Sequence, residues 1–295
     1  MTTFPRAVLG VAAFGAAGLG YSLWEAKQFR LRRVDLRVLP PGERPLRVLH
    51  LSDLHLTPGQ RDKQEWVQRL ATLRPDLVVD TGDNLAHPDA VEPALEALGP
   101  LLEVPGVFVM GSNDYYAPRL KSPMHYFNPE SDRRIHGPEL PWRDLRDGFV
   151  SAGWTDLDNA RATVKVDDRT FDFVGVDDAH LGLDNYDEVS GPADPSASLA
   201  IGVTHAPYLR VLDRMADDAF PLVFAGHTHG GQLCLPGIGA LVTNCDLPRS
   251  QAKGLHRRGE QWLHVSAGLG TSPFTPVRFA CPPEASLVTL LPRHT

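Results

Sequence analysis

Cysteine is scarce in this 295-residue sequence, which contains only Cys234, Cys245 and Cys281. The three are widely spaced and form no Cys-x-x-Cys pair, so the sequence argues against a disulfide framework and against a zinc site built from thiolates. An excess of positive charge is also absent, because the formal net charge is -7 and the pI is near 5.9. General nucleic-acid binding usually needs a basic face, so we expect no nucleic-acid partner.

Long apolar runs are rare as well, and the one exception lies at the N-terminus. Residues 7–24 carry no charge and are rich in alanine and glycine. The stretch is roughly 18 residues long, the lower limit for a helix that spans a bilayer. One arginine precedes it, and four basic residues follow it: Lys27, Arg30, Arg32 and Arg33. We interpret the stretch as an uncleaved membrane anchor, whose heavier C-terminal basic flank would place the main domain in the cytoplasm. A cleaved or purely export-directing segment is the alternative.

The remaining sequence indicates one catalytic domain. We assign residues 1–36 to the anchor and its basic flank, residues 37–45 to a linker, and residues 46–295 to the domain. Frequent glycine and proline, 26 of each, favour strands and loops over a helical bundle. Short apolar runs alternate with helical patterns beyond residue 45, which predicts a layered α/β fold.

Residue types that bind metals stand directly after the apolar runs. Asp53-Leu54-His55 follows the run Leu46–Leu51. In an extended segment, side chains two residues apart face the same side, so this carboxylate and this imidazole can converge on one divalent metal. Four later runs end in the same way and are followed by Asp83, Asn113, His205, and the pair His227 and His229. In layered α/β folds, ligands collect where strands end in loops, so all five motifs can meet at one rim.

These candidate ligands suit a two-metal centre for phosphoryl transfer. Two metals about 3.5–4 Å apart can hold both the attacking and the departing oxygen of an in-line displacement. Such a pair needs a bridging carboxylate, and Asp83, which follows Gly82 with no histidine beside it, is the natural bridge. Nitrogen and oxygen ligands without thiolate favour Mn²⁺, Fe or Zn²⁺ over Ca²⁺.

In this order, the motifs resemble those of the calcineurin-like metallophosphoesterase superfamily: Asp-x-His, Gly-Asp, Gly-Asn-His-Asp/Glu, a lone His and Gly-His-x-His. The resemblance runs from about residue 46 to the C-terminus, and four of the five motifs match. Within the superfamily, the chain is similar to the membrane-associated bacterial branch that includes the YkuE and YaeI phosphoesterases. Residues 175–180, 266–270 and 282–284 support this narrower resemblance.

The resemblance implies a fold and two ligand sets. The fold is a sandwich of two facing mixed β-sheets flanked by helices, here preceded by one membrane-anchoring helix. One metal would be held by Asp53, His55 and His229 together with Asp83. The other would be held by Asn113, His205 and His227, again with Asp83.

One motif departs from the family pattern. Where the family has Gly-Asn-His-Asp, this chain has Gly111-Ser112-Asn113-Asp114. Without a gap, Ser112 stands at the metal-binding Asn and Asn113 at the catalytic His. Shifted by one residue, Asn113 is the ligand and Asp114 replaces the His. We favour the shifted register because an Asn carbonyl is the better neutral oxygen ligand. Asp114 is then the candidate catalytic acid, provided that its pKa lies well above the reference value of about 3.9.

The sequence therefore predicts a hydrolase that cleaves a phosphodiester or phosphoanhydride with a hydroxide activated by two divalent metals. The missing histidine favours substrates with a good leaving group, such as a pyrophosphate. Two alternatives remain: a hydrolase of a membrane lipid pyrophosphate, similar to UDP-diacylglucosamine pyrophosphatase, and a non-catalytic metal-binding scaffold. The expected partners are a phosphorylated small molecule or lipid, and the membrane.

Three further features are weaker candidates. The segment Tyr115–Trp142, with His125 and His136, is either a substrate-facing loop or a solvated excursion. His180 is a candidate for the edge of the site, with a loop hydrogen bond as the alternative. Arg278 is a candidate for phosphate binding, with a surface ion pair as the alternative.

Overall fold

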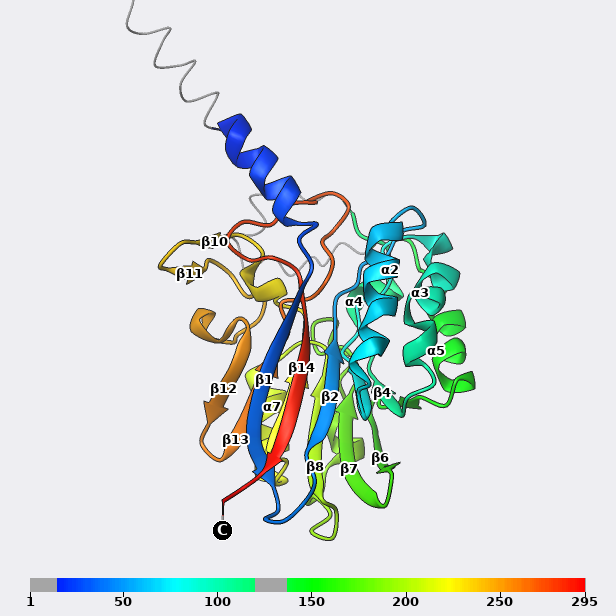
Figure 1. The fold of residues 1–295 in the computed structure, drawn as a ribbon, viewed down its shortest axis with the longest axis vertical. Coiled ribbons are helices and arrows are strands. Elements are labelled where there is room, and N and C mark those ends of the chain that lie inside the picture. Colours follow the sequence, from blue (N-terminus) through cyan, green and yellow to red (C-terminus); the bar gives the residue numbers. More distant parts are fainter. Residues whose placement is uncertain (1–14, 120–136, 295) are drawn as a thin grey trace, which may run out of the picture.

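The computed structural model describes residues 15–119 and 137–294, which form two six-stranded sheets packed face to face (Figure 1). In spatial order, the first sheet contains β1 (Arg30–Leu39), β14 (Glu284–Pro292), β2 (Leu46–Leu51), β3 (Leu77–Asp80), β4 (Gly106–Phe108) and β5 (Thr155–Asp156). The second contains β12 (Gly254–Arg258), β13 (Gln261–Val265), β9 (Leu222–Ala225), β8 (Leu199–Thr204), β7 (Arg169–Val176) and β6 (Ala160–Val166). A small hairpin joins β10 (Cys234–Leu235) to β11 (Gly239–Ala240).

Helices cover the outer faces of both sheets. The α-helices are α2 (Arg61–Arg69), α3 (Val91–Leu98), α4 (Ser112–Tyr115), α5 (Trp142–Ser151), α6 (Tyr186–Val189) and α7 (Leu209–Asp217), and residues 15–25 are helical too. The short 3₁₀-helices are η1 (Leu70–Leu73), η2 (Pro88–Ala90), η3 (Gly99–Leu101), η5 (His229–Gly231) and η6 (Arg249–Gln251). Strands β2 to β5 run parallel, as do β7, β8, β9 and β13. Their carboxyl ends therefore point the same way within each sheet.

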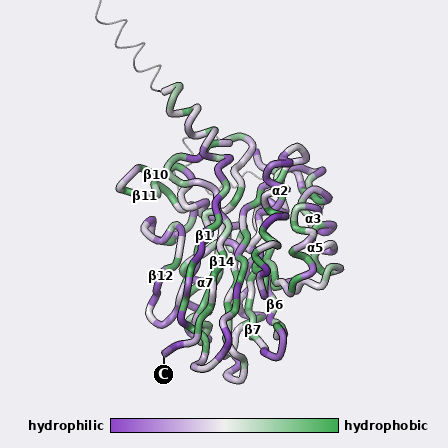
Figure 2. The backbone as a smooth tube through the Cα atoms, viewed as in Figure 1, coloured by the Kyte–Doolittle hydropathy of each residue, from purple (hydrophilic) through white to green (hydrophobic). Residues whose placement is uncertain are grey.

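The apolar runs of the sequence are continuous because both faces of the central strands are buried. On β2, Val48 faces the core between the sheets, whereas Leu49 and Leu51 face the core beneath α2, α3 and α5. On β7, Phe173 faces the inter-sheet core and Val174 faces the core beneath α6 and α7. Apolar residues accordingly mark the middle strands in Figure 2. The prediction of two sheets flanked by helices is confirmed.

The N-terminal region differs from the expected division into flank and linker. Residues Arg30–Leu39 form β1, which pairs along its length with β14, so they are an edge strand of the first sheet. Only residues 40–45 connect it to β2. The apolar positions Leu36, Val38 and Leu39 of β1 are buried in the inter-sheet core, and Arg37 lies between the first two. Arg30, Arg32 and Arg33, which the sequence indicates as a membrane flank, lie in the first half of the same strand.

The predicted anchor, residues 7–24, lies partly outside the described residues. Among the helices of residues 15–119 and 137–294, none is long and apolar enough to cross a bilayer. His125 and His136 also lie outside the described residues, as does most of the segment in which they were predicted to contact substrate.

Candidate metal centre

The candidate ligands gather where the carboxyl ends of the two sheets meet. Each candidate follows the end of a parallel strand. The strands are β2, β3 and β4 in the first sheet and β8 and β9 in the second. Two backbone bonds tie the first two loops together, from Asp53 N–H to Gly82 O at 2.8 Å and from His55 N–H to Asp83 O at 2.9 Å. The position at the strand ends agrees with the general location of sites in α/β folds.

The backbone at these residues is unusual. Asp53, His55, Asp83, His227 and His229 all have positive φ, between 42° and 68°. Few non-glycine residues adopt this left-handed conformation, and those that do cluster at functional sites because the surrounding structure must hold them there. The loops also approach closely, since a Cβ added at Gly226 would overlap Ser52 Oγ. The chain therefore holds these side chains in fixed positions, at a cost in backbone strain.

The first cluster consists of Asp53, His55, Asp83 and His229, whose ligand atoms all lie within 4.8 Å of one another. His55 Nε2 is 3.2 Å from His229 Nε2 and 3.4 Å from Asp83 Oδ2. His229 Nε2 is 3.5 Å from Asp53 Oδ1, and that buried oxygen has no hydrogen-bond partner. Imidazole nitrogens and carboxylate oxygens facing one point are the donors that divalent transition metals prefer. The donor set and the unsatisfied oxygen therefore fit a cation.

The second cluster consists of Asn113, His205 and His227 around the same Asp83. Asp83 Oδ1 is 3.5 Å from His205 Nε2 and accepts the backbone N–H of Asn113 at 2.7 Å. Its Oδ2 accepts the side-chain amide of Asn113, also at 2.7 Å. His205 Nε2 lies 3.3 Å from His227 Nδ1. All seven predicted ligands are thus brought together, and Asp83 lies between the two clusters.

Backbone carbonyls orient the imidazoles of the second cluster. His205 Nδ1 lies 2.7 Å from Thr81 O and donates its proton there, so Nε2 is the nitrogen that faces Asp83. His227 Nε2 lies 3.2 Å from Asn244 O, which leaves Nδ1 free to face His205. Outer hydrogen bonds of this kind fix the tautomer and ring orientation of metal-binding histidines. No sequence pattern identifies either carbonyl, because every residue has one.

Burial and neighbouring charges shift the pKa values of the aspartates and histidines at the centre. Burial and the nearby charge of Asp83 raise the pKa of Asp53 to about 7. Burial works against ionisation of Asp83 too, but His205, His55 and hydrogen bonds from Asn113 hold its pKa below the ordinary value. Burial lowers the pKa of His55 to about 4, so this imidazole is neutral and can act as a ligand. A bound cation would supply the charge that these carboxylates lack.

The altered loop places Asn113 and Asp114 differently. Asn113 contacts both oxygens of Asp83, as described above, whereas Asp114 is fully buried. The Asp114 carboxylate accepts four backbone N–H groups, those of Asp83, Asn84, Leu85 and Gly111, at 2.7–3.1 Å. Burial and the charge of Asp83 raise its pKa to about 7, as a catalytic acid would need, while the N–H groups act in the opposite direction. In this geometry, Asp114 holds the loops together and presents no atom at the surface of the site.

Two buried basic side chains lie beside the first cluster: Lys63, which the sequence does not single out, and Arg278, whose burial the sequence does not predict. Lys63 is only 6% exposed, and its Nζ donates to Leu54 O at 2.7 Å and lies 3.5 Å from His55 O. It sits at the start of an amphipathic helix, α2, where a lysine ordinarily faces solvent. Arg278 is fully buried, and its guanidinium donates to the carbonyls of His229, Ala267, Gly268, Gly270 and Cys281. Neither a surface ion pair nor an exposed phosphate ligand describes it.

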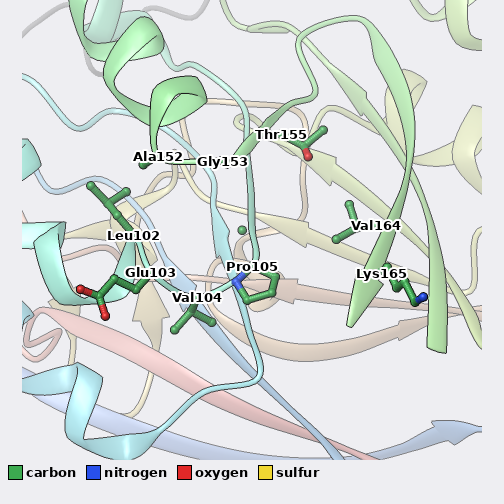
Figure 3. A pocket seen from close by; sticks show the side chains of 10 residues that line it. Leu102, Glu103, Val104, Pro105, Ala152, Gly153, Thr155, Val164 and Lys165 are labelled. Atoms are coloured by element: carbon green, nitrogen blue, oxygen red, sulfur yellow. The ribbon is translucent and has the colours of Figure 1, made fainter. Parts of the chain in front are cut away.

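The other predicted candidate, His180, lies at the edge of the second cluster. Its ring centroid is 4.5 Å from that of His227, and its Nδ1 is 3.1 Å from Tyr208 Oη. A cavity of about 340 Å³ lies elsewhere, at the amino-terminal ends of β4 and β5, and is lined by residues such as Val104 and Thr155 (Figure 3). It contains no candidate ligand, so the metal clusters remain the candidate site.

Comparison with known proteins agrees with the geometry. The calcineurin-like phosphoesterase family matches residues 46–231. The uncharacterised metallophosphoesterase YkuE of Bacillus subtilis (strain 168) is 26% identical over 302 residues, covering 97% of this chain and 96% of the relative. An uncharacterised metallophosphoesterase of Aquifex aeolicus (strain VF5) is 28% identical, covering 92% of this chain and 95% of the relative. The phosphodiesterase YaeI of Escherichia coli (strain K12) is 25% identical, covering 94% of each.

These matches confirm the superfamily predicted from the motifs, and with the histidine and aspartate cluster they support a hydrolase over a non-catalytic scaffold. The chain belongs to the calcineurin-like phosphoesterase family and is a metal-dependent phosphoesterase.

Proposed function

We propose that the chain hydrolyses a phosphodiester or phosphoanhydride at a centre of two divalent metals. The observation that carries this proposal is the position of Asp83. One of its oxygens lies 3.4 Å from His55 Nε2 and the other 3.5 Å from His205 Nε2, so a single carboxylate faces both clusters. A bridging carboxylate is what distinguishes a two-metal centre from two separate sites.

In this proposal, the first cluster holds one metal through Asp53, His55, Asp83 and His229, and the second holds the other through Asp83, Asn113, His205 and His227. Two bound cations supply Lewis acidity to the phosphoryl oxygens and lower the pKa of water. The nitrogen and oxygen donors favour Mn²⁺, Fe or Zn²⁺ as the bound metals.

Other groups of the protein orient the ligands, and the loop 111–114 determines which leaving groups suit the site. Thr81 O and Asn244 O fix the histidine tautomers, and Asn113 orients Asp83 through two hydrogen bonds. No histidine stands between Gly111 and Asp114, and the Asp114 carboxylate faces backbone N–H groups. With neither group presenting a proton to a departing oxygen, the site suits leaving groups that depart as stable anions. A phosphodiester with an acidic alcohol, or a phosphoanhydride, meets this requirement.

The test measures metal content as well as turnover. The full chain is stripped with chelator, reloaded with Mn²⁺, Fe²⁺ or Zn²⁺, and assayed on a chromogenic phosphodiester while bound metal is counted by mass spectrometry. We expect two ions per chain and turnover that returns only with metal. One ion per chain at saturation would contradict the two-metal proposal. The variant His264→Gln, which changes a buried histidine outside both clusters, is the matched control and should keep both ions.

We also propose that residues 7–24 anchor the chain in a membrane, with the catalytic domain on the cytoplasmic side. The support is the absence of charge over this stretch and the basic residues that follow it. The full chain should pellet with membranes after alkaline carbonate washing. A variant with Ala12→Arg and Ala16→Arg should be released, because charges at the centre of a span are costly. Equal release of both chains would contradict the anchor.

A further inference from the structure

Exposed apolar side chains are concentrated in one region of the molecule. Among the described residues, eleven large apolar side chains are exposed, and nine of them lie in the helix 15–25, in residues 233–241, which contain the β10–β11 hairpin, and in the loop 271–279. We name these nine the apolar rim: Leu19, Tyr21, Leu23, Trp24, Leu233, Leu235, Ile238, Leu241 and Phe274. Ile238, at the hairpin turn, is 74% exposed. Scattered apolar residues are normal on a surface, but such concentration marks an interaction site.

The three segments form one continuous surface. Leu233 pairs with Phe279 in an isolated β-bridge, and the ring of Phe279 lies 5.5 Å from that of Tyr21. Arg278 N–H donates to Ser22 O at 3.0 Å, which fastens the helix to the loop. In Figure 1, the helix, the hairpin and this loop lie at the same end of the molecule as the carboxyl end of β2.

The apolar rim also adjoins the metal centre. The 3₁₀-helix His229–Gly231, which begins with a candidate ligand, is followed after two residues by β10, the first strand of the hairpin. After β11, Asn244 O accepts from His227. In the third segment, Arg278 donates to His229 O. The chain segments that carry the apolar rim therefore also position the ligands.

The sequence around the helix indicates what covers the apolar rim. An uncharged stretch, residues 7–24, carries the aromatic residues Tyr21 and Trp24 near its C-terminal end and is followed by Lys27 and Arg30. Tryptophan and tyrosine favour the membrane–water interface, and lysine and arginine favour its aqueous side. A second copy of the chain would need an apolar face but not this order. The order therefore favours a lipid surface at the level of Trp24.

We propose that the apolar rim docks on a lipid bilayer, with the hairpin turn and Phe274 in the interface and the metal centre facing the headgroup layer. The site would then take phosphate esters or anhydrides carried by membrane lipids, whose phosphates lie at that depth. This substrate class rests on the proposed hydrolase function, whereas the docking does not and can be tested without turnover.

The first test follows one position of the hairpin. The full chain, as Ile238→Cys in a Cys245→Ser background, is labelled with an environment-sensitive fluorophore and mixed with vesicles of phosphatidylcholine and phosphatidylglycerol. Cys234 and Cys281 are buried and should not react. The matched control is Val150→Cys, an exposed apolar position on α5 outside the apolar rim.

Quenching by nitroxide lipids should be several-fold stronger at position 238 than at position 150, because only the hairpin enters the interface. Equal quenching at the two positions, or no vesicle binding, would overturn the docking. The fluorophore at position 238 could instead be shielded without lipid, in a dimer seen by light scattering. That result would assign the apolar rim to a second copy of the chain and would also overturn the docking on lipid.

The second test connects docking to substrate. The double variant Leu235→Asp with Ile238→Asp should lower turnover of a phosphate ester embedded in vesicles about tenfold, by removing apolar burial, and leave a soluble chromogenic diester unaffected. Val150→Asp should change neither. Equal loss on both substrates would overturn the lipid-facing site. Failure of the unmodified chain on both would instead reject the hydrolase function, and the fluorescence result would still decide the docking.

Discussion

The two metal clusters share Asp83 but are built in different ways. The first has two carboxylates, and the buried basic side chains of Lys63 and Arg278 support its loops. The second has only the shared carboxylate, an amide and two imidazoles, whose outer nitrogens bond to backbone carbonyls. More negative charge among the donors strengthens cation binding at short range. The comparison therefore predicts a tight first site and a weaker second site joined by one bridge.

The largest effect should come from removing the bridge. Asp83→Ala takes the shared oxygen donors from both clusters at once, so both ions should be lost and turnover should fall by about a thousandfold or more. Metal content and turnover of a chromogenic diester are measured at equal folded fraction. Asp172→Ala, which removes a buried carboxylate that belongs to neither cluster and pairs with Arg161, is the control and should keep both ions. Activity within a few-fold of the unmodified chain would end the two-metal proposal.

The difference between the clusters can be measured with one variant in each. Asp53→Asn removes a charge from the first cluster, and Asn113→Ala removes a neutral donor from the second. Titration calorimetry with Mn²⁺ should show the tight phase weakened by the first variant and the weak phase by the second. The larger loss should follow Asp53→Asn, because a charged donor contributes more than an amide.

Ser112→Ala is the comparison variant for the loop register. If Asn113 is the ligand, Ser112→Ala should leave both phases unchanged. If Ser112 is the ligand, the weak phase should respond to Ser112→Ala and hardly to Asn113→Ala. The side-chain amide of Asn113 donates to Asp83 Oδ2 at 2.7 Å, which places this side chain beside the bridge.

Lys63, beside the first cluster, should have a smaller and more selective effect on metal binding. Lys63→Met keeps the length of the side chain but removes the donor to Leu54 O, so the loop that carries His55 should loosen. Outer hydrogen bonds around metal ligands typically contribute about 10–100-fold to metal affinity, and we expect a loss in that range for the tight phase alone. Lys165→Met, an exposed lysine on β6, is the control. A matching loss in the weak phase would show that Lys63 acts through general stability.

The sequence predicted that the candidate ligands gather at one place, because each follows an apolar run. That pattern is local, and the parallel order of the strands then brings Asp53, Asp83 and His205 to one edge of the structure. What it missed depends on contacts between distant segments. Lys63 and Arg278 have the composition of surface residues, and only the folded loops bury them. The carbonyls of Thr81 and Asn244 leave no trace in a sequence, because every residue has one.

The edge strand β1 was missed for a related reason. Arg30, Arg32 and Arg33 were interpreted as a membrane flank because they follow an uncharged stretch. These arginines and the apolar residues between and after them form a strand. The strand pairs with β14, which lies at the other end of the sequence. Pairing over such a separation cannot be derived from local pattern.

The smallest effect concerns Asp114, which ties the loop of Asp83 to Gly111 without belonging to either cluster. Asp114→Asn would replace one acceptor oxygen by an amide donor facing backbone N–H groups of Asp83 or Gly111. Leaving a buried N–H unpaired costs about 1–3 kcal/mol, so the free energy of unfolding should fall by that amount in denaturant titrations. Turnover should fall only a few-fold, and equally for an activated diester and a simple alkyl ester, because the loop shifts under both substrates alike. A catalytic acid would give a different result, namely a selective loss on the alkyl ester, whose leaving oxygen needs a proton. That selective loss, with stability unchanged, would return Asp114 to the catalytic role that the sequence predicted and would show that the loop opens during the reaction.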